Sequence, residues 1–279
     1  MTGGCARTSR RAAAGFLLLA LLCTLVFLGP LVSPSGWDDT DLTALHEGPS
    51  ARHWLGTTQS GRDVFALTLR GARTSLLAGL FVAAAATGLA AVIGAAAGYA
   101  GGRLDRVLMW GADLLLVLPA FLVAAVLAPR LPGGLPVLMA VLAALMWMVT
   151  ARAVRAMTVS LRRSEHVLAA RYLGVGAPRV VVRHVLPHLA SLLAVDASLN
   201  VGVAIVAESG LSYLGFGVRP PDVSLGTLIA DGQGTAAAHP WPFAFAAGLL
   251  VLVVLAVNLL GDGLRDAFDP TAGPVRDAR

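Results

Sequence analysis

Six apolar runs divide this sequence and set the strongest limit on what it can fold into. They occupy residues 14–33, 76–100, 107–128, 135–151, 189–207 and 243–260. A helix needs about 20 apolar residues to cross roughly 30 Å of hydrocarbon. The run at 135–151 is short and the run at 189–207 contains Asp196, so these two fit the requirement least well. We predict an all-α, polytopic membrane protein with six transmembrane helices.

The composition supports membrane insertion and excludes several classes of function. Hydrophobic residues make up 57% of the chain and charged residues only 13%, whereas about 25% of a typical soluble domain is charged. All 21 basic residues are arginine; a P-loop needs a lysine, so the chain cannot itself be a P-loop ATPase. The two cysteines provide neither a disulfide framework nor a metal-ligand spacing. Nucleic acid binding needs a clustered soluble basic patch, whereas membrane orientation explains the net charge of +5.

The distribution of arginine predicts the orientation in the membrane. With the N-terminus in the cytoplasm, fifteen arginines fall on the cytoplasmic side and six on the outer side, as the positive-inside rule requires. Both termini are then cytoplasmic in a multi-pass protein of the plasma (inner) membrane. No small-residue cleavage pattern follows the first run, which favours an uncleaved anchor over a signal peptide.

This orientation divides the chain into segments. We predict a cytoplasmic N-terminus with the anchor helix at 1–33, an extracytoplasmic segment at 34–75, a membrane domain at 76–262 and a cytoplasmic tail at 263–279. Within the membrane domain, residues 152–188 form the longest cytoplasmic loop, with seven arginines. A loop of this length between two spans is a place where a soluble partner could dock.

A short helix is predicted inside that loop, from Glu165 to Gly174. Ser164 is a suitable N-cap and Gly174 a suitable left-handed stop, with Pro178 just beyond. Apolar residues recur at helical spacing, at Leu161, Leu168, Tyr172 and Leu173. The pattern is equally compatible with a helix on the membrane surface and with a helix that docks onto a partner.

Three acidic residues lie within or at the ends of the spans, where an uncompensated charge is expensive. They are Asp113, Asp196 and Glu208. Such a residue marks either a solute path or a subunit contact. The alternative for Asp113 and Glu208 is a position near the interface, where the carboxylate reaches water or an arginine. A structural role is favoured for Glu208, and both interpretations stay open for Asp196.

Small residues and a proline predict how the spans pack. Gly94 and Gly98 form a GxxxG pattern, which permits close helix contact and favours packing within this subunit over a subunit interface. Pro119 should kink the third span, for plain packing or as a gating hinge. His184 and His188 stand four residues apart, but Pro187 interrupts their helix and no third ligand is nearby, so no metal site is expected.

Several motifs resemble those of one transporter family. Ala169-Ala-Arg-Tyr-Leu-Gly174 and Arg183-His-Val-Leu-Pro187 resemble the EAA loop of bacterial ABC importer permeases. Further similar stretches span residues 53–63, 71–76, 98–106, 208–221 and 258–270. The resemblance is to the dipeptide/oligopeptide/nickel group, and most of all to the C-type permease subunit of dipeptide importers. It implies the type I ABC importer permease fold.

The resemblance also implies a division of labour. A second homologous permease subunit completes the pathway, two cytoplasmic ABC ATPases bind ATP and Mg, and an extracytoplasmic solute-binding protein delivers the solute. This chain itself then binds no cofactor and is no enzyme. The short loop helix would sit in a cleft of the ATPase, where Ala169 and Ala170 allow close approach. Its coupling residues are Glu165, Leu168, Ala169, Ala170, Tyr172, Leu173, Gly174, Leu186 and Pro187.

One departure concerns the glutamate that gives the EAA motif its name. Leu168 stands at that position, and Glu165, about one helical turn earlier, could supply a carboxylate instead. The expected solute is a di- or oligopeptide, with nickel or another small ligand as the alternative. A proton-coupled secondary transporter using Asp113 and Asp196 is a less favoured hypothesis. An intramembrane enzyme would need a facing nucleophile and base, and the sequence shows no such pair.

Overall fold

The computed structural model describes residues 3–33 and 35–268, and its regular elements there are all helical. The longest helices are α1 (Gly3–Val32), α2 (Val64–Ala100), α9 (Ala190–Tyr213) and α11 (Trp241–Phe268). Shorter helices lie between them: α3 (Gly102–Val117), α4 (Ala120–Leu127), η1 (Ala128–Arg130), α5 (Gly134–Met146), α6 (Met148–Leu161), α7 (Glu165–Tyr172), α8 (Ala177–Val180), η2 (Val181–Val185), η3 (Leu186–Leu189) and α10 (Leu225–Gln233). Of the predicted tail, residues 269–279 lie outside the described part.

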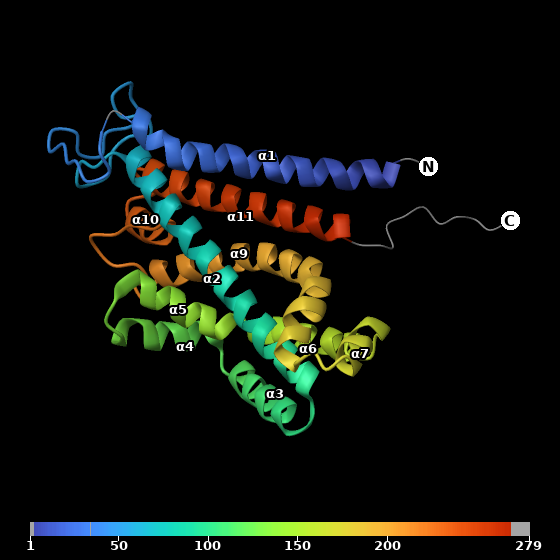
Figure 1. Cartoon of the computed structure of the whole chain (residues 1–279). Helices are drawn as coiled ribbons and strands as arrows, with labels where there is room; N and C mark the ends of the chain where they lie inside the picture. The colour runs from blue at the N-terminus through green and yellow to red at the C-terminus, as the bar shows by residue number, and fades with distance from the viewer. Residues whose placement is uncertain (1–2, 34, 269–279) are drawn as a thin grey trace.

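Length and hydropathy confirm the predicted spans. Four helical stretches are long and apolar enough to cross a membrane: Ala13–Val32, Val64–Ala100, Ala177–Tyr213 and Trp241–Ala267. Two bent helix pairs, Gly102–Val117 with Ala120–Arg130 and Gly134–Met146 with Met148–Leu161, bring the number to six when each pair counts as one span. The start of α1, the end of α11 and α7 lie toward one end of the molecule, and α10 lies toward the other (Figure 1).

Each bent pair has a different local cause. The first bends by 81° at Pro119, where the kink was expected. The residue before it, Leu118, adopts an extended conformation, as proline favours for its predecessor. The second pair bends by 43° at Trp147, without a proline. The indole of Trp147 donates a hydrogen bond of 3.0 Å to the carbonyl of Ala144, one turn earlier. Hydropathy carries no signal for this second bend.

Three helix ends lie outside the predicted apolar runs. Helix α2 begins at Val64, within the stretch 34–75. Helix α6 continues to Leu161 and the next helical stretch starts at Ala177, so that 162–176, including α7, connect the two. A helix can continue beyond its apolar run because polar side chains at its ends can reach water, and apolar runs alone do not reveal this. Helix α10 was missed because it is short and lies between spans.

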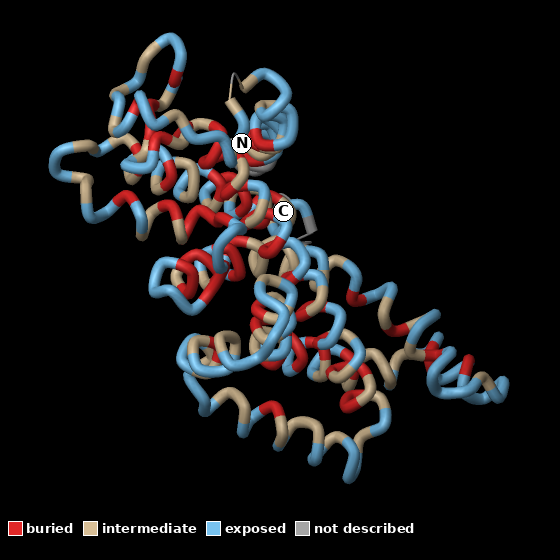
Figure 2. Tube along the Cα trace, turned by 90° about the vertical axis from the view of Figure 1, so that its left-hand side faces the viewer, coloured by how far each residue is buried: buried red, intermediate tan, exposed pale blue. Residues whose placement is uncertain are grey.

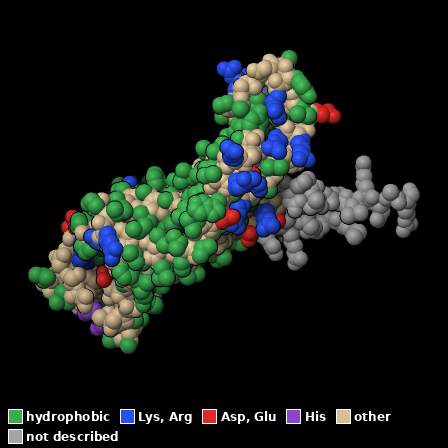
Figure 3. Space-filling view, turned by 90° about the horizontal axis from the view of Figure 1, so that it is seen from below, with side chains coloured by type: hydrophobic (Ala, Val, Ile, Leu, Met, Phe, Trp, Pro, Cys, Tyr) green, Lys and Arg blue, Asp and Glu red, His purple; other side chains and the backbone are tan. Residues whose placement is uncertain are grey.

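Helices α2 and α9 hold the membrane domain together. One core cluster joins them to α1 and α11, through residues such as Val26, Leu69, Ile205 and Val253. A second cluster joins them to α4 and α5, through Leu138 and others. Buried positions concentrate along these contacts, and exposed positions lie on the outer faces (Figure 2). The face seen in Figure 3 is broadly hydrophobic along its middle, as expected for a surface that meets lipid.

Candidate functional site

Helix α7 ends in a Schellman motif, as the glycine predicted. Gly174 has φ +77°, the left-handed conformation that favours glycine. The amide of Val175 donates to the carbonyl of Ala170 at 3.1 Å, and that of Gly174 donates to Arg171 at 3.0 Å. At the other end, Ser164 occupies the N-cap position, but its hydroxyl donates to the carbonyl of Leu161 at 2.6 Å. The predicted helix is present, and the expected cap hydrogen bond is not formed.

The two faces of α7 have different partners. Val167 and Ala170 are buried in a cluster with Val180, Val185 and Leu189. Ala170 therefore packs against its own chain, whereas Ala169 is exposed. Helical periodicity accounts for the difference, because Ala170 lies three residues after Val167 and shares its inward face.

The outward face of α7 leaves large apolar side chains in the open. Tyr172 is 89% exposed and Leu173 is 84% exposed. Glu165, Leu168 and Ala169 are exposed beside them. Among the other predicted coupling residues, Leu186 packs partly against the cluster beneath α7 and Pro187 is exposed. We call Glu165, Leu168, Ala169, Tyr172 and Leu173 the α7 surface.

Arginines on α6 pair with aspartates on α3. Arg155 donates to both carboxylate oxygens of Asp105, at 2.5 and 2.6 Å. Arg152 forms a salt bridge with Asp113. Asp113 thus has the arginine partner that one of its two interpretations required. The two pairs tie α3 to α6 close to the α7 end of the molecule, where Figure 3 shows arginine side chains gathered.

Asp196 on α9 joins three spans. Its carboxylate accepts hydrogen bonds from Thr150 on α6, at 2.8 and 2.9 Å, and from Asn200 at 2.8 Å. Thr87 on α2 donates to it at 3.4 Å. Three side chains therefore compensate a half-buried carboxylate within this subunit. This network was not predictable, because two of its three donors, Thr87 and Thr150, are distant from Asp196 in the sequence.

Glu208, near the C-terminal end of α9, is fully buried. Ser75 on α2 donates to it at 2.8 Å, Ser212 at 2.7 Å and Ser209 at 3.3 Å. The hydroxyl of Ser75 also accepts the amide of Leu225, at the start of α10, at 3.2 Å. The contacts agree with the structural role favoured for Glu208, since they join α2, α9 and α10.

The GxxxG pattern packs α2 against α6 within this chain. A Cβ atom on Gly94 would lie 2.5 Å from the carbonyl oxygen of Ala151. One on Gly98 would lie 2.7 Å from the carbonyl oxygen of Arg155. Both approaches are too close for any side chain, so the two glycines allow the helices to touch along their backbones.

The two histidines considered as ligands make local contacts. The Nδ1 atom of His188 lies 2.7 Å from the carbonyl oxygen of His184, four residues earlier. The ring of His188 stacks on that of His166, with centroids 4.8 Å apart. These contacts join α7 to the helical stretch that leads into α9.

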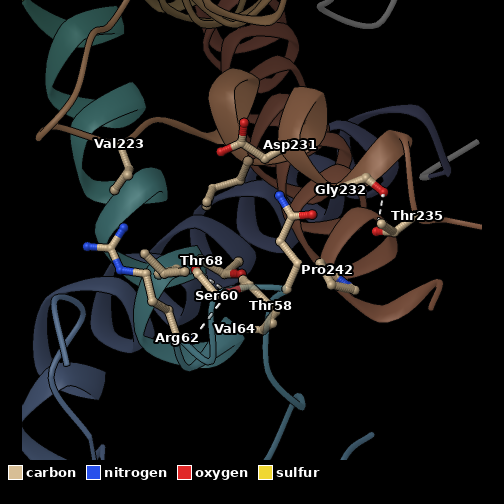
Figure 4. Close-up of a pocket in the computed structure, with 13 residues that line it drawn as sticks. Thr58, Ser60, Arg62, Val64, Thr68, Val223, Asp231, Gly232, Thr235 and Pro242 are labelled. Carbon is tan, nitrogen blue, oxygen red and sulfur yellow. Dashed lines mark hydrogen bonds between the residues drawn. The ribbon is translucent and has the colours of Figure 1, made fainter. Parts of the chain in front are cut away.

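The opposite end of the molecule contains a pocket that the sequence did not reveal. It is partly open to solvent and lies between residues 58–68, α10 and the start of α11. Arg62 and Asp231 lie on different sides of it (Figure 4). The surrounding segment is fixed by Asp63, which caps α2 through the amide of Ala66 at 2.9 Å and contacts His53 at 2.9 Å. The residues that line this pocket are up to more than 150 positions apart in the sequence, so no local motif predicts it.

Comparisons with known proteins identify the family. Residues 90–273 match the family described as "Binding-protein-dependent transport system inner membrane component". The oligopeptide transport system permease protein OppC of Mycobacterium tuberculosis is 50% identical over 270 residues, covering 96% of this chain and 93% of the relative. A putative peptide permease protein of Brucella suis is 41% identical over 97% of this chain and 92% of its own length.

A more distant relative spans nearly the same region. The oligopeptide transport system permease protein OppC of Bacillus subtilis is 34% identical over 95% of this chain and 87% of its own length. The resemblance to ABC importer permeases of the peptide group is confirmed by these relatives, and the helical architecture agrees with it. The chain is a multi-pass membrane protein that belongs to the family of binding-protein-dependent transport system inner membrane components, the permeases of ABC importers.

Proposed function

We propose that this chain is the membrane-spanning permease subunit of an ATP-driven importer of di- or oligopeptides, working by alternating access. The relatives named as oligopeptide and peptide permeases support this solute class over nickel. The arginine distribution supports an orientation with both termini in the cytoplasm. In that orientation α7 faces the cytoplasm, and the pocket near α10 faces the side from which solute arrives.

The α7 surface is the observation that carries the coupling role. The inward face of helix α7 is held by the buried Val167 and Ala170, while Tyr172 and Leu173 project outward. Exposed large apolar side chains on a rigid helix are suited to fill a partner pocket. Closure of the ATPases on ATP then selects one of two packed helix arrangements. The same surface is less suited to a helix lying on the membrane, because it includes the charged Glu165 and lies beside the exposed Arg171.

In the proposed assembly, this chain has three kinds of protein partner besides lipid. A second homologous permease subunit shares the pathway, two cytoplasmic ABC ATPase subunits or domains hold ATP and Mg, and an extracytoplasmic solute-binding protein delivers the peptide. This chain supplies no catalytic residue for ATP hydrolysis, in keeping with relatives that are transport components. No nucleic acid takes part.

The test is uptake of labelled dialanine by proteoliposomes that contain the complete complex, with and without ATP on the cytoplasmic side. We expect uptake that needs ATP and stops with vanadate. Uptake that ignores vanadate and follows a proton gradient would replace the proposal with a secondary transporter. Uptake of nickel but no peptide would keep the permease and change its solute.

The coupling role is tested by Gly174→Leu, with Gly176→Ala as the matched control. Gly174 has a positive φ that a leucine adopts only with strain, whereas Gly176 has φ −60° and open space around it. We expect Gly174→Leu to abolish uptake while the subunit still inserts, and Gly176→Ala to transport normally. Normal uptake by Gly174→Leu would contradict the coupling role of α7.

A further inference from the structure

Two opposite charges face the pocket near α10 without touching each other. The guanidinium of Arg62 and the carboxylate of Asp231 both line it, from the outer segment and from α10 (Figure 4). Among the described residues, neither group takes part in a salt bridge. The guanidinium of Arg62 lies over the ring of Trp37, 5.9 Å from its centroid, a cation–π contact that helps to position it. The pocket thus presents one positive and one negative wall.

A buried hydroxyl that lacks a hydrogen-bond partner within the described part of the chain also lines this pocket. Thr68 lines the same pocket and is only 4% exposed. Its Oγ1 atom has no hydrogen-bond partner among the described residues. A buried hydroxyl without a partner costs free energy, and most such groups in native structures are satisfied. A polar ligand in the pocket would supply the missing partner.

One part of the wall is apolar. Leu67, Val223 and Leu228 are buried there, whereas Thr58, Gln59, Ser60 and Thr235 add further polar lining. Small-molecule sites combine apolar surface with polar groups that orient the ligand. The local charges are also affected by this enclosure. Desolvation by the walls raises the pKa of Asp231, although one side of the residue stays open to solvent, and Arg62 partly opposes that shift.

We propose that this pocket is a binding site for a zwitterionic short peptide, with the terminal carboxylate on Arg62, the terminal ammonium near Asp231 and a side chain against the apolar wall. An extended dipeptide carries opposite charges roughly 7 Å apart, and these charges are opposite in sign to those of the two groups that line the pocket. The inference rests on the proposed import of peptides and adds a place where the permease itself holds the solute. The pocket would receive the peptide on the solute-delivery side, before the pathway opens.

The experiment measures binding of labelled dialanine to the purified complete complex without its solute-binding protein, by equilibrium dialysis. Two analogues serve as further probes: N-acetyl-dialanine, which lacks the ammonium, and dialanine amide, which lacks the carboxylate. The wild-type complex should bind dialanine about tenfold or more tightly than either analogue, as expected for losing a charged contact. Equal binding of all three would overturn the proposal without any variant.

The variants assign the two ends of the peptide. Arg62→Gln should weaken dialanine about tenfold and leave dialanine amide unchanged, while Asp231→Asn should weaken dialanine and leave N-acetyl-dialanine unchanged. The matched control is Arg52→Gln, which removes an outer arginine that is 77% exposed and belongs to another ion pair. Size-exclusion chromatography verifies that each complex assembles. If Arg62→Gln and Arg52→Gln weaken dialanine binding equally, the assignment of the peptide carboxylate to Arg62 is wrong.

A second readout separates this inference from the proposed function. Uptake by proteoliposomes is measured with the solute-binding protein present. ATP-dependent dipeptide uptake together with no binding to the pocket would overturn the site and leave the importer standing. The alternative occupant of the pocket is a segment of the solute-binding protein. In that case Arg62→Gln would lose binding of the solute-binding protein, and no complex would bind dialanine. This result too would overturn the peptide site. Absence of peptide uptake by the wild type would remove the proposed function.

Discussion

Ser75 on α2 donates a hydrogen bond of 2.8 Å to the carboxylate of Glu208 on α9, in a site closed to solvent. The same hydroxyl accepts the amide of Leu225 at the start of α10. One serine therefore joins three helices, α2, α9 and α10, at the end of the molecule where α10 lies. Its removal would leave both a buried carboxylate and a buried amide with one partner fewer.

We expect Ser75→Ala to lower the free energy of unfolding by about 1–3 kcal/mol, the cost of leaving buried polar groups unsatisfied. Thermal unfolding of the purified subunit in detergent, followed by tryptophan fluorescence, measures the change. Thr24→Ala is the control, since that hydroxyl is exposed and bonds only to the carbonyl of Ala20 in its own helix. Equal midpoints for the two variants would contradict the importance of the Ser75 contacts.

Gly94→Ala should separate α2 from α6, because the new Cβ would lie 2.5 Å from a backbone oxygen. Overpacking of this kind costs about 1–3 kcal/mol. Gly88→Ala is a matched control in the same helix, with open space around the new methyl group. Yield of monodisperse protein and the unfolding midpoint are the measurements. If Gly94→Ala is as stable as Gly88→Ala, the tight packing described for this pair is wrong.

Tyr172→Ser and Leu173→Ser should separate partner binding from folding. Both side chains are almost fully exposed, so the stability of the isolated subunit should stay within about 0.5 kcal/mol of wild type. Copurification of the ATPases should fall sharply. Val167→Ser, in the buried face of the same helix, should instead lower the unfolding midpoint. Unchanged ATPase recovery from both exposed variants would exclude the α7 surface as the docking site.

Acidification should weaken dipeptide binding at a higher pH than an ordinary aspartate would dictate. Desolvation raises the folded-state pKa of Asp231. As the pH falls through that raised pKa, the carboxylate gains a proton and loses its attraction for the peptide ammonium. The raised pKa also means that protonation favours the folded state, so this group does not destabilise the protein in acid. Dialanine binding measured across pH should lose its acidic limb in Asp231→Asn; an identical profile in both proteins would contradict the ammonium contact.

Hydropathy and local motifs predicted the parts of this molecule that depend on neighbouring residues. The six spans follow from apolar length, the kink at Pro119 from proline geometry, and the end of α7 from the φ that Gly174 allows. The bend at Trp147 lacked such a signal because helix-forming residues flank it. The sequence pattern did not show that Ala170 lies on the inward face of α7, since the direction of a helix face depends on what the helix packs against.

The candidate sites show the same limit. The α7 surface could be located from one continuous segment, whereas the pocket with Arg62 and Asp231 joins residues from two distant segments. The Asp196 network likewise needs donors from α2 and α6. A single sequence contains no information on which distant segments meet, so these sites became visible only in the folded chain.

The buried face of α7 has a mechanical consequence. Val167 and Ala170 are clamped to Val180, Val185 and Leu189, and the stretch that carries these three continues directly into α9. A force on Tyr172 would therefore rotate α7 and the start of α9 together. Asp196 lies about two helical turns after Leu189, so that this rotation would act directly on the contacts of Asp196 with α2 and α6.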